Sequence, residues 1–234
     1  MKIAVFHGSP RKGNTYKATK IFLDELSSCG NAKITEFFLP KSMPEFCTGC
    51  QLCFSGPYEK CPHSQYVIPI LEEILSADAL IFTTPHFGAC DMSACMKNLL
   101  DHLDFLTLTV APRAELFKKK AFIITTATGS AAAIKPIKKY LENWGVNRVY
   151  CLGIKMFTDK WDKMTEVKQA KIEKRLRVAA SKFYNAPKRL PKISTIFMYH
   201  ISKFILKNML VRVHIHMNIG KKMDILINDH FNNF

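Results

Sequence analysis

The stretch MKIAVFHGSPRKGNTY, residues 1–16, decides the fold. Its apolar run from Ile3 to Phe6 is typical of a strand that is buried on both faces. A loop of small and polar residues follows at 8–14, and a helical pattern begins near Thr15. At such a junction small residues let backbone N–H groups turn inward, and the helix N-terminus favours an anion. The sequence therefore predicts a phosphate-binding loop.

The loop lacks two well-known nucleotide fingerprints. A nucleoside-triphosphate loop needs a lysine directly after the second glycine, but Asn14 follows Gly13 here. The dinucleotide pattern G-x-G-x-x-G is also absent. We therefore expect a monophosphate site, and an ordinary βα turn rich in small residues is the alternative. The expected phosphate-binding residues are Ser9, Arg11, Gly13, Asn14 and Thr15.

Strand and helix patterns alternate along the first 185 residues. Strands are expected near 2–7, 33–39, 78–84, 120–127 and 148–154. Helices are expected near 14–28, 66–76, 92–106, 131–144 and 162–184. This alternation predicts an α/β fold with a five-stranded parallel sheet covered on both faces. The loops after the first, third and fourth strands should meet at the carboxyl edge of the sheet, where ligands of such folds bind.

Four stretches together resemble the flavodoxin-like, NAD(P)H-dependent FMN reductase family, which includes the iron–sulfur flavoproteins. They are the loop in residues 1–16, the cysteine motif at 47–53, and the segments 77–88 and 92–102. The last two contain the matching residues Pro85, Phe87, Met92, Ser93, Lys97 and Asp101, whereas His102 replaces an arginine. The resemblance extends to about residue 155.

This resemblance implies a flavodoxin-like three-layer sandwich that binds FMN. It further implies that NAD(P)H delivers a hydride to the flavin and that a small-molecule or protein acceptor takes the electrons. Family members often form homodimers or higher homo-oligomers. No catalytic side chain is expected, since the flavin carries the chemistry. The residues expected at the flavin ring are Pro85, His86, Phe87, Gly88, Thr126, Ala127 and Gly129.

Four cysteines, Cys47, Cys50, Cys53 and Cys61, form a C-x2-C-x2-C-x7-C motif. Through the resemblance they are candidate ligands of a [4Fe–4S] cluster. Bare cysteines that shape a loop beside the flavin, and a zinc site, are the alternatives. A cluster would favour a second function, in which the protein transfers single electrons or senses oxidants. Because a core strand opens the chain in place of a secretory signal, we expect a cytoplasmic protein.

The net charge of +15 is concentrated near the C-terminus. Residues 174–223 contain twelve Lys and Arg and no Asp or Glu, whereas the remainder has 22 basic and 19 acidic residues. We expect an FMN-binding domain at 1–185 and a basic helical extension at 186–234, joined at Pro187 and Pro191.

An apolar helix is expected at 194–213, followed by a short strand-like run, VHIHMN, to which no metal is assigned. Charges interrupt the helix too often for a membrane span. The favoured interpretation is that it packs on its own domain or on a second subunit. Peripheral contact with an anionic membrane is the next alternative. Contact with nucleic acid is the least favoured, and no nucleic-acid partner is expected.

Overall fold

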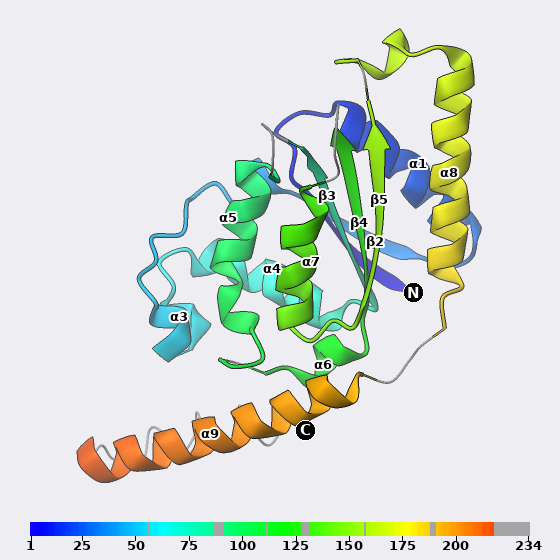
Figure 1. The fold of residues 1–234 in the computed structure, drawn as a ribbon. Coiled ribbons are helices and arrows are strands. Elements are labelled where there is room, and N and C mark those ends of the chain that lie inside the picture. The colour runs from blue at the N-terminus through cyan, green and yellow to red at the C-terminus, as the bar shows by residue number, and fades with distance from the viewer. Residues whose placement is uncertain are drawn as a thin grey trace.

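The centre of the fold is a parallel sheet with strand order β2-β1-β3-β4-β5 (Figure 1). The computed structural model describes residues 1–55, 57–86, 91–110, 112–127, 132–156, 158–187 and 191–217. The strands are β1 (Lys2–His7), β2 (Lys33–Phe38), β3 (Ala79–Pro85), β4 (Lys120–Ala127) and β5 (Arg148–Lys155). This is the flavodoxin-like order, so the predicted fold class is confirmed.

Helices cover both faces of the sheet. One face carries α1 (Asn14–Ser28) and α8 (Glu166–Tyr184), and the other carries α4 (Ser64–Ser76), α5 (Ala94–His102) and α7 (Ile134–Asn143) (Figure 1). The strand β1 shows why its sequence is apolar throughout. Ile3 and Val5 pack in the core under α1 and α8, whereas Ala4 and Phe6 pack in the core on the opposite face.

Several one-turn elements lie outside the regular alternation. They are α2 (Leu39–Ser42), α3 (Leu52–Ser55), α6 (Ala114–Phe117), and the 3-10 turns η1 (Tyr58–Lys60), η2 (Asp104–Leu106) and η3 (Trp161–Lys163). Two helices were predicted too long, because one-turn elements beside them were included in the predicted range. The helix expected at 92–106 ends at His102 and is followed by η2, and the one expected from 162 begins as η3 before α8. Elements of a single turn are too short to carry a hydrophobic period.

The strand order reverses between β1 and β3, which pair in parallel in the middle of the sheet. The chain leaves β1 toward α1, on one face, and leaves β3 toward α5, on the other. Loops that diverge in this way leave a crevice at the carboxyl ends of the two strands, where ligands of open α/β sheets bind.

The C-terminal helix α9 (Ile193–Met217) runs along the end of the sheet opposite to that crevice (Figure 1). The Tyr199 ring meets the Phe117 ring edge-on, with 5.3 Å between centroids. The prediction of a strand-like run at 213–218 was wrong, since α9 continues to Met217. A lone strand there would leave its backbone groups unpaired, whereas a helix satisfies them within the segment. None of the described helices has the length and unbroken apolar character needed to cross a bilayer.

Candidate active site

The predicted cofactor residues converge at the carboxyl ends of β1, β3 and β4. There they line one hollow of about 190 Å³. The nine that do so are Ser9, Arg11, Gly13, Asn14, Thr15, Pro85, His86, Thr126 and Ala127. The other three, Phe87, Gly88 and Gly129, lie outside the described residues. Loops more than 100 residues apart in sequence therefore form one site.

The start of α1 has the features of an anion site. Its N-cap is Gly13, which offers no side-chain cap, and the first turn contains no acidic residue. The first backbone N–H groups of the helix and its dipole are thus left for a ligand. Ser9 Oγ shapes the loop by accepting from Arg11 N at 3.4 Å and donating to Arg11 O at 2.8 Å. The Arg11 guanidinium supplies positive charge at the same hollow.

Two of the predicted phosphate ligands also hold the site together. Thr15 Oγ1 lies 2.6 Å from Thr126 Oγ1 in a buried hydrogen bond that joins α1 to the end of β4. The Asn14 amide donates to the carbonyls of Thr158 and Asp159, at 3.3 and 3.2 Å. The amide of Asn14 is therefore used to fix the loop after β5, and its predicted contact with phosphate stays a prediction.

The residues after β5 are the part of the site that the sequence patterns missed. Met156, Thr158 and Asp159 line the hollow. No local sequence pattern marks them; the strand register places them there, since Ala127 pairs with Lys155 and Met156 N donates to Ala127 O at 2.5 Å. Asp159 brings a carboxylate toward an anion site. Its ion pair with Lys163, at 2.9 Å, lowers the pKa of Asp159 and offsets its charge.

The loop after β3 presents a buried polar atom that has no partner among the described residues. His86 lines the hollow, and its backbone N donates to Thr126 O at 2.9 Å, which joins this loop to β4. The ring atom His86 Nδ1 is buried without a hydrogen bond in this part of the chain. Buried polar atoms are almost always paired in native proteins. This atom fits the polar edge of a bound heteroaromatic ring, so the residues present suit FMN.

Ser93 fixes the relative position of the first two loops. It is the N-cap of α5 and accepts from Met96 N at 3.3 Å. Its hydroxyl donates to Gly8 O, and its backbone N donates to Thr84 Oγ1 at 3.0 Å. One buried side chain thus connects the phosphate loop, the end of β3 and the start of α5.

The family comparison agrees with this geometry. The model of the NADPH-dependent FMN reductases matches residues 1–157. The chain belongs to this family. A search of curated protein sequences finds no match. As a member of the FMN reductases the protein is an FMN-dependent NAD(P)H oxidoreductase, and its predicted enzyme class is confirmed.

Solved structures with the same fold include three flavin enzymes. An apo NADH:FMN oxidoreductase has 18% sequence identity over 83% of this chain and 92% of its own, with a TM-score of 0.58. An FMN-dependent NADH-azoreductase from Bacillus anthracis has 14% identity over 79% and 100%, with a TM-score of 0.59. An NAD(P)H:quinone oxidoreductase from Methanothermobacter marburgensis has 17% identity over 80% and 97%, with a TM-score of 0.59. At this identity the likeness shows the shared fold.

The four motif cysteines lie near each other but do not form a metal centre. Cys47 and Cys50 are exposed, and Cys53 and Cys61 are half-buried. Among the described residues no three His, Cys, Asp or Glu side chains converge in an arrangement that could hold a metal ion. Burial and the neighbouring thiols raise the pKa of Cys53 to about 11, and burial raises that of Cys61.

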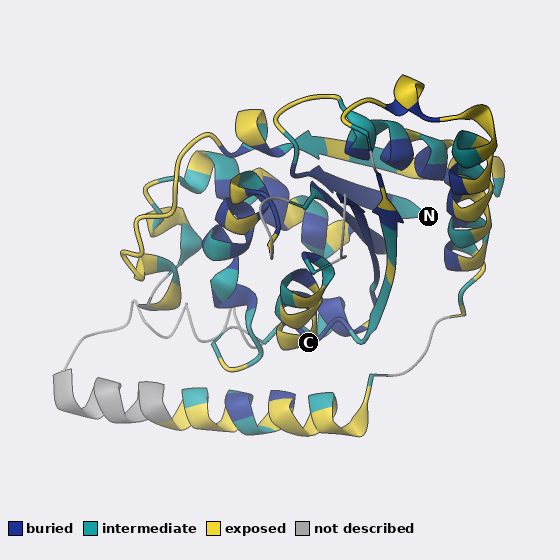
Figure 2. Ribbon diagram, turned by 45° about the horizontal axis from the view of Figure 1, so that its top comes forward, coloured by how far each residue is buried: buried dark blue, intermediate teal, exposed yellow. Residues whose placement is uncertain are grey.

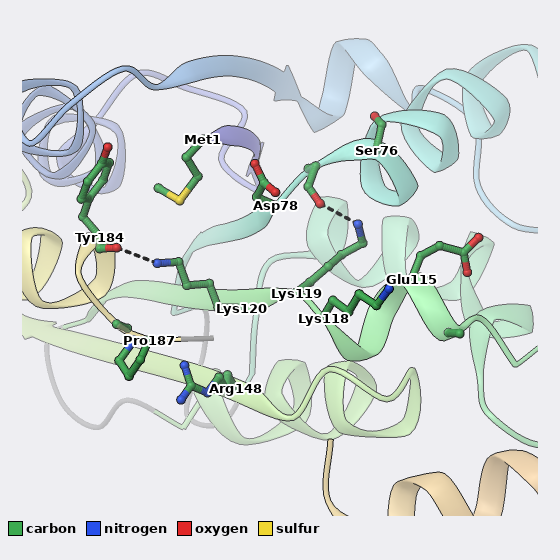
Figure 3. Close-up of a pocket in the computed structure, with 13 residues that line it drawn as sticks. Met1, Ser76, Asp78, Glu115, Lys118, Lys119, Lys120, Arg148, Tyr184 and Pro187 are labelled. Atoms are coloured by element: carbon green, nitrogen blue, oxygen red, sulfur yellow. Dashed lines mark hydrogen bonds between the residues drawn. The ribbon is translucent and has the colours of Figure 1, made fainter. Parts of the chain in front are cut away.

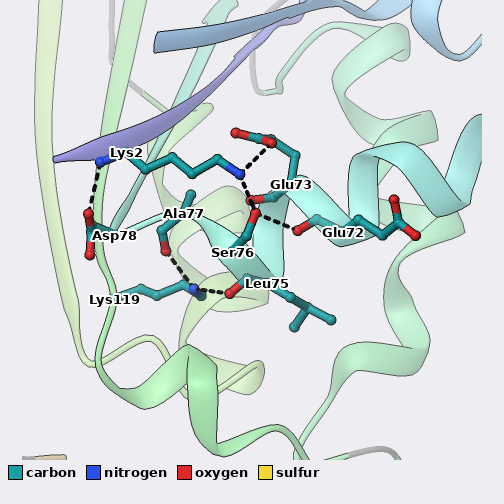
Figure 4. Close-up of polar contacts among 8 residues, drawn as sticks. All are labelled: Lys2, Glu72, Glu73, Leu75, Ser76, Ala77, Asp78 and Lys119. Carbon is teal, nitrogen blue, oxygen red and sulfur yellow. Dashed lines mark hydrogen bonds and ion pairs between the residues drawn. The ribbon is translucent and has the colours of Figure 1, made fainter. Parts of the chain in front are cut away.

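A larger hollow of about 840 Å³ lies at the other edge of the sheet, near the strand N-termini (Figure 3). Two of its lysines are already engaged by backbone carbonyls. Lys119 Nζ donates to Leu75 O and Ala77 O at the end of α4, at 2.6 and 2.5 Å (Figure 4). Burial lowers the pKa of Lys119 to about 8. Lys120 Nζ donates to the last carbonyls of α8. These contacts satisfy helix C-termini, so we assign the lysines a structural role.

His7, the last residue of β1, makes the stability of the site region sensitive to pH. Its ring stacks on Phe38 with 4.5 Å between centroids, and Nε2 lies 2.8 Å from Glu36 Oε2. Burial lowers the pKa of His7, while Glu36 opposes the shift. The unfolded chain, with a histidine pKa of about 6.5, therefore binds the proton more readily than the folded chain. The free energy of unfolding should decrease as pH falls below that value.

Glu36→Gln should enlarge this pH dependence. The substitution removes the carboxylate that favours the protonated ring, so the pKa of His7 falls further. Each unit by which the pKa of His7 in the folded chain lies below its value in the unfolded chain lowers the free energy of unfolding by about 1.4 kcal/mol at low pH. Urea unfolding at pH 7.5 and pH 5.0 measures the effect, with the exposed Glu59→Gln as the matched control. A pH dependence in E36Q equal to or smaller than that of the unmodified protein would contradict this account of His7.

Proposed function

We propose that this FMN reductase transfers electrons from NAD(P)H to a small aromatic acceptor of the quinone or azo class. One observation carries the proposal: residues from the ends of β1, β3 and β4 line one hollow at the point where the strand order reverses. The solved relatives act on acceptors that their names state, among them azo compounds and quinones. When FMN is bound, its flavin ring supplies the chemistry, because the ring can accept a hydride.

The chain's own residues would bind and orient the cofactor. In this proposal the backbone N–H groups at the start of α1, with Ser9, Arg11 and Thr15, hold the phosphate. His86 contributes a buried polar atom toward the edge of the ring. The Ser93 hydrogen bonds keep the phosphate loop and the ring loop at a fixed separation. No general acid or base is required of the protein.

We further propose that the motif cysteines shape the loop beside the site and hold no cluster. This is supported by their arrangement, since no three potential metal-binding side chains converge among the described residues. Asn98, on α5, ties this loop down by accepting from Cys47 N at 3.1 Å. A cytoplasmic location fits the seven described cysteines, which are all free thiols. The division at residues 185 and 186 and the homodimer stay predictions.

A single preparation tests these statements. Protein purified without air should contain about one FMN per chain and should oxidise NADH or NADPH when menadione or methyl red is supplied. Absence of bound FMN after reconstitution, or of any NAD(P)H oxidation with either acceptor, would contradict the proposed function. Iron analysis of the same sample tests the cysteines separately: about four irons per chain would restore the cluster and the electron-transfer alternative.

A further inference from the structure

In the part of the chain that the structure describes, α9 is held to the domain through one side. Tyr199 and Ser202 are buried, and the Tyr199 ring packs against Phe117 of α6. Thr195 Oγ1 donates to Asn147 Oδ1 at 2.8 Å, just before β5. These three residues recur at helical spacing and so define the inner face of α9.

The outer face of α9 is exposed (Figure 2), and it carries large apolar side chains. Ile193, Phe197 and Phe204 are 87, 63 and 68% exposed. At about 100° per residue they fall within about 40° of one another, on the side opposite to Tyr199 and Ser202. The exposed His200 lies between Phe197 and Phe204 on the same side. Large apolar side chains grouped in water in such an interrupted stripe are a mark of an interaction surface. The described part of the chain contains nothing that covers it.

The charges beside this stripe are all of one sign. The exposed Lys192 and Lys207 lie on one flank of the helix, as its rotation per residue requires, whereas Lys203 Nζ lies over the Tyr199 ring, 5.8 Å from its centroid. Residues 174–223 contain no Asp or Glu. If two copies of α9 met through the stripe, their lysines would approach without an opposing carboxylate on either helix. A surface that carries negative charge and offers an apolar interior beneath it complements both features.

We infer that α9 docks on an anionic lipid bilayer. The stripe of Ile193, Phe197 and Phe204 enters the boundary between head groups and acyl chains, and the lysine flank faces the lipid phosphates. The helix lies along the surface, since no described helix could cross the bilayer. This docking would keep the flavin site, at the opposite end of the sheet, open to the aqueous phase.

Vesicle sedimentation tests the inference with the full chain. We expect binding to vesicles of phosphatidylglycerol and phosphatidylcholine, little binding to pure phosphatidylcholine, and weaker binding as salt is raised. Phe197→Ser with Phe204→Ser should lower the partition coefficient at least about 100-fold, since each phenylalanine contributes about tenfold or more. Lys192→Gln with Lys207→Gln should lower it about 30-fold, at about 1 kcal/mol for each lysine. All four positions are exposed or near-exposed, so folding should be retained.

Matched controls and oligomer mass complete the test. Val167→Ser and Lys171→Gln alter exposed residues of the same kinds on α8 and should leave vesicle binding unchanged. Circular dichroism and sedimentation velocity should show unaltered folding and mass in every variant. The inference fails if the unmodified protein does not bind anionic vesicles at low salt, or if the double phenylalanine variant binds as well. It also fails if that variant has a smaller oligomer mass, which would identify a second copy as the partner.

Discussion

Replacing Ser9 and Thr15 together by alanine should weaken FMN binding about 100- to 10,000-fold. A hydrogen bond to a charged acceptor contributes about 1.5–3 kcal/mol, and the double variant removes two of them. Thr15 can serve a phosphate although it is bonded to Thr126, because the pair has two hydroxyl hydrogens and one hydrogen bond between them. The loss at Ser9 also removes the contacts that hold the loop at Arg11.

Measurements with riboflavin separate the loss of hydrogen bonds to the phosphate from the loss of the loop contacts at Arg11. Riboflavin lacks the phosphate, so its affinity should be almost unchanged in S9A/T15A, while the affinity for FMN falls toward that of riboflavin. Titration of the apoprotein by quenching of flavin fluorescence measures both. Ser28→Ala with Thr165→Ala removes one serine and one threonine hydroxyl at exposed positions and serves as the control. An unaltered dissociation constant for FMN in S9A/T15A would show that this loop does not bind the phosphate.

The second large effect is expected from Gly8→Ala. A Cβ at this position would lie 2.9 Å from Met96 Cβ and 3.0 Å from Ser93 Oγ, closer than real Cβ contacts. Met96 and Ser93 are almost fully buried and cannot move aside without disturbing α5. Overpacking and weakened Ser93 hydrogen bonds together should lower the free energy of unfolding by about 2–4 kcal/mol. FMN affinity should fall as well, because Gly8 begins the phosphate loop.

Gly13→Ala is the comparison that isolates the steric cause. Its Cβ would meet nothing nearer than the Arg11 side chain at 3.8 Å. Urea unfolding of the two apoproteins should therefore show a large loss for G8A and a small one for G13A. Equal losses would mean that the close approach of Gly8 to α5 does not limit stability.

The sequence by itself determined the elements whose signals are local. The strand expected at 2–7 is β1, and the one expected at 148–154 is β5 with one residue added. The apolar run of β1 is buried on both faces by the helices on either side of the sheet, whereas β5, at the sheet edge, is only partly buried. The same local patterns placed the loops after β1, β3 and β4 at one edge, and hence nine site residues in one hollow. Parallel strands joined by helices have their carboxyl ends together, so this convergence follows from the order of elements alone.

Only the tertiary structure decided which atoms in that hollow are already engaged and which are left for a ligand. The contact between Thr15 and Thr126 joins residues 111 apart, and the one between Asn14 and Asp159 joins residues 145 apart. No pattern within a short window carries such information, because these partners are selected by strand register and by packing across the sheet. The same holds for Ser93, whose role depends on the approach of α5 to Gly8. The inner face of α9 was likewise not readable from its sequence, because large apolar residues occur on several sides of the helix. Its contacts with Phe117 and Asn147 decide which side remains exposed.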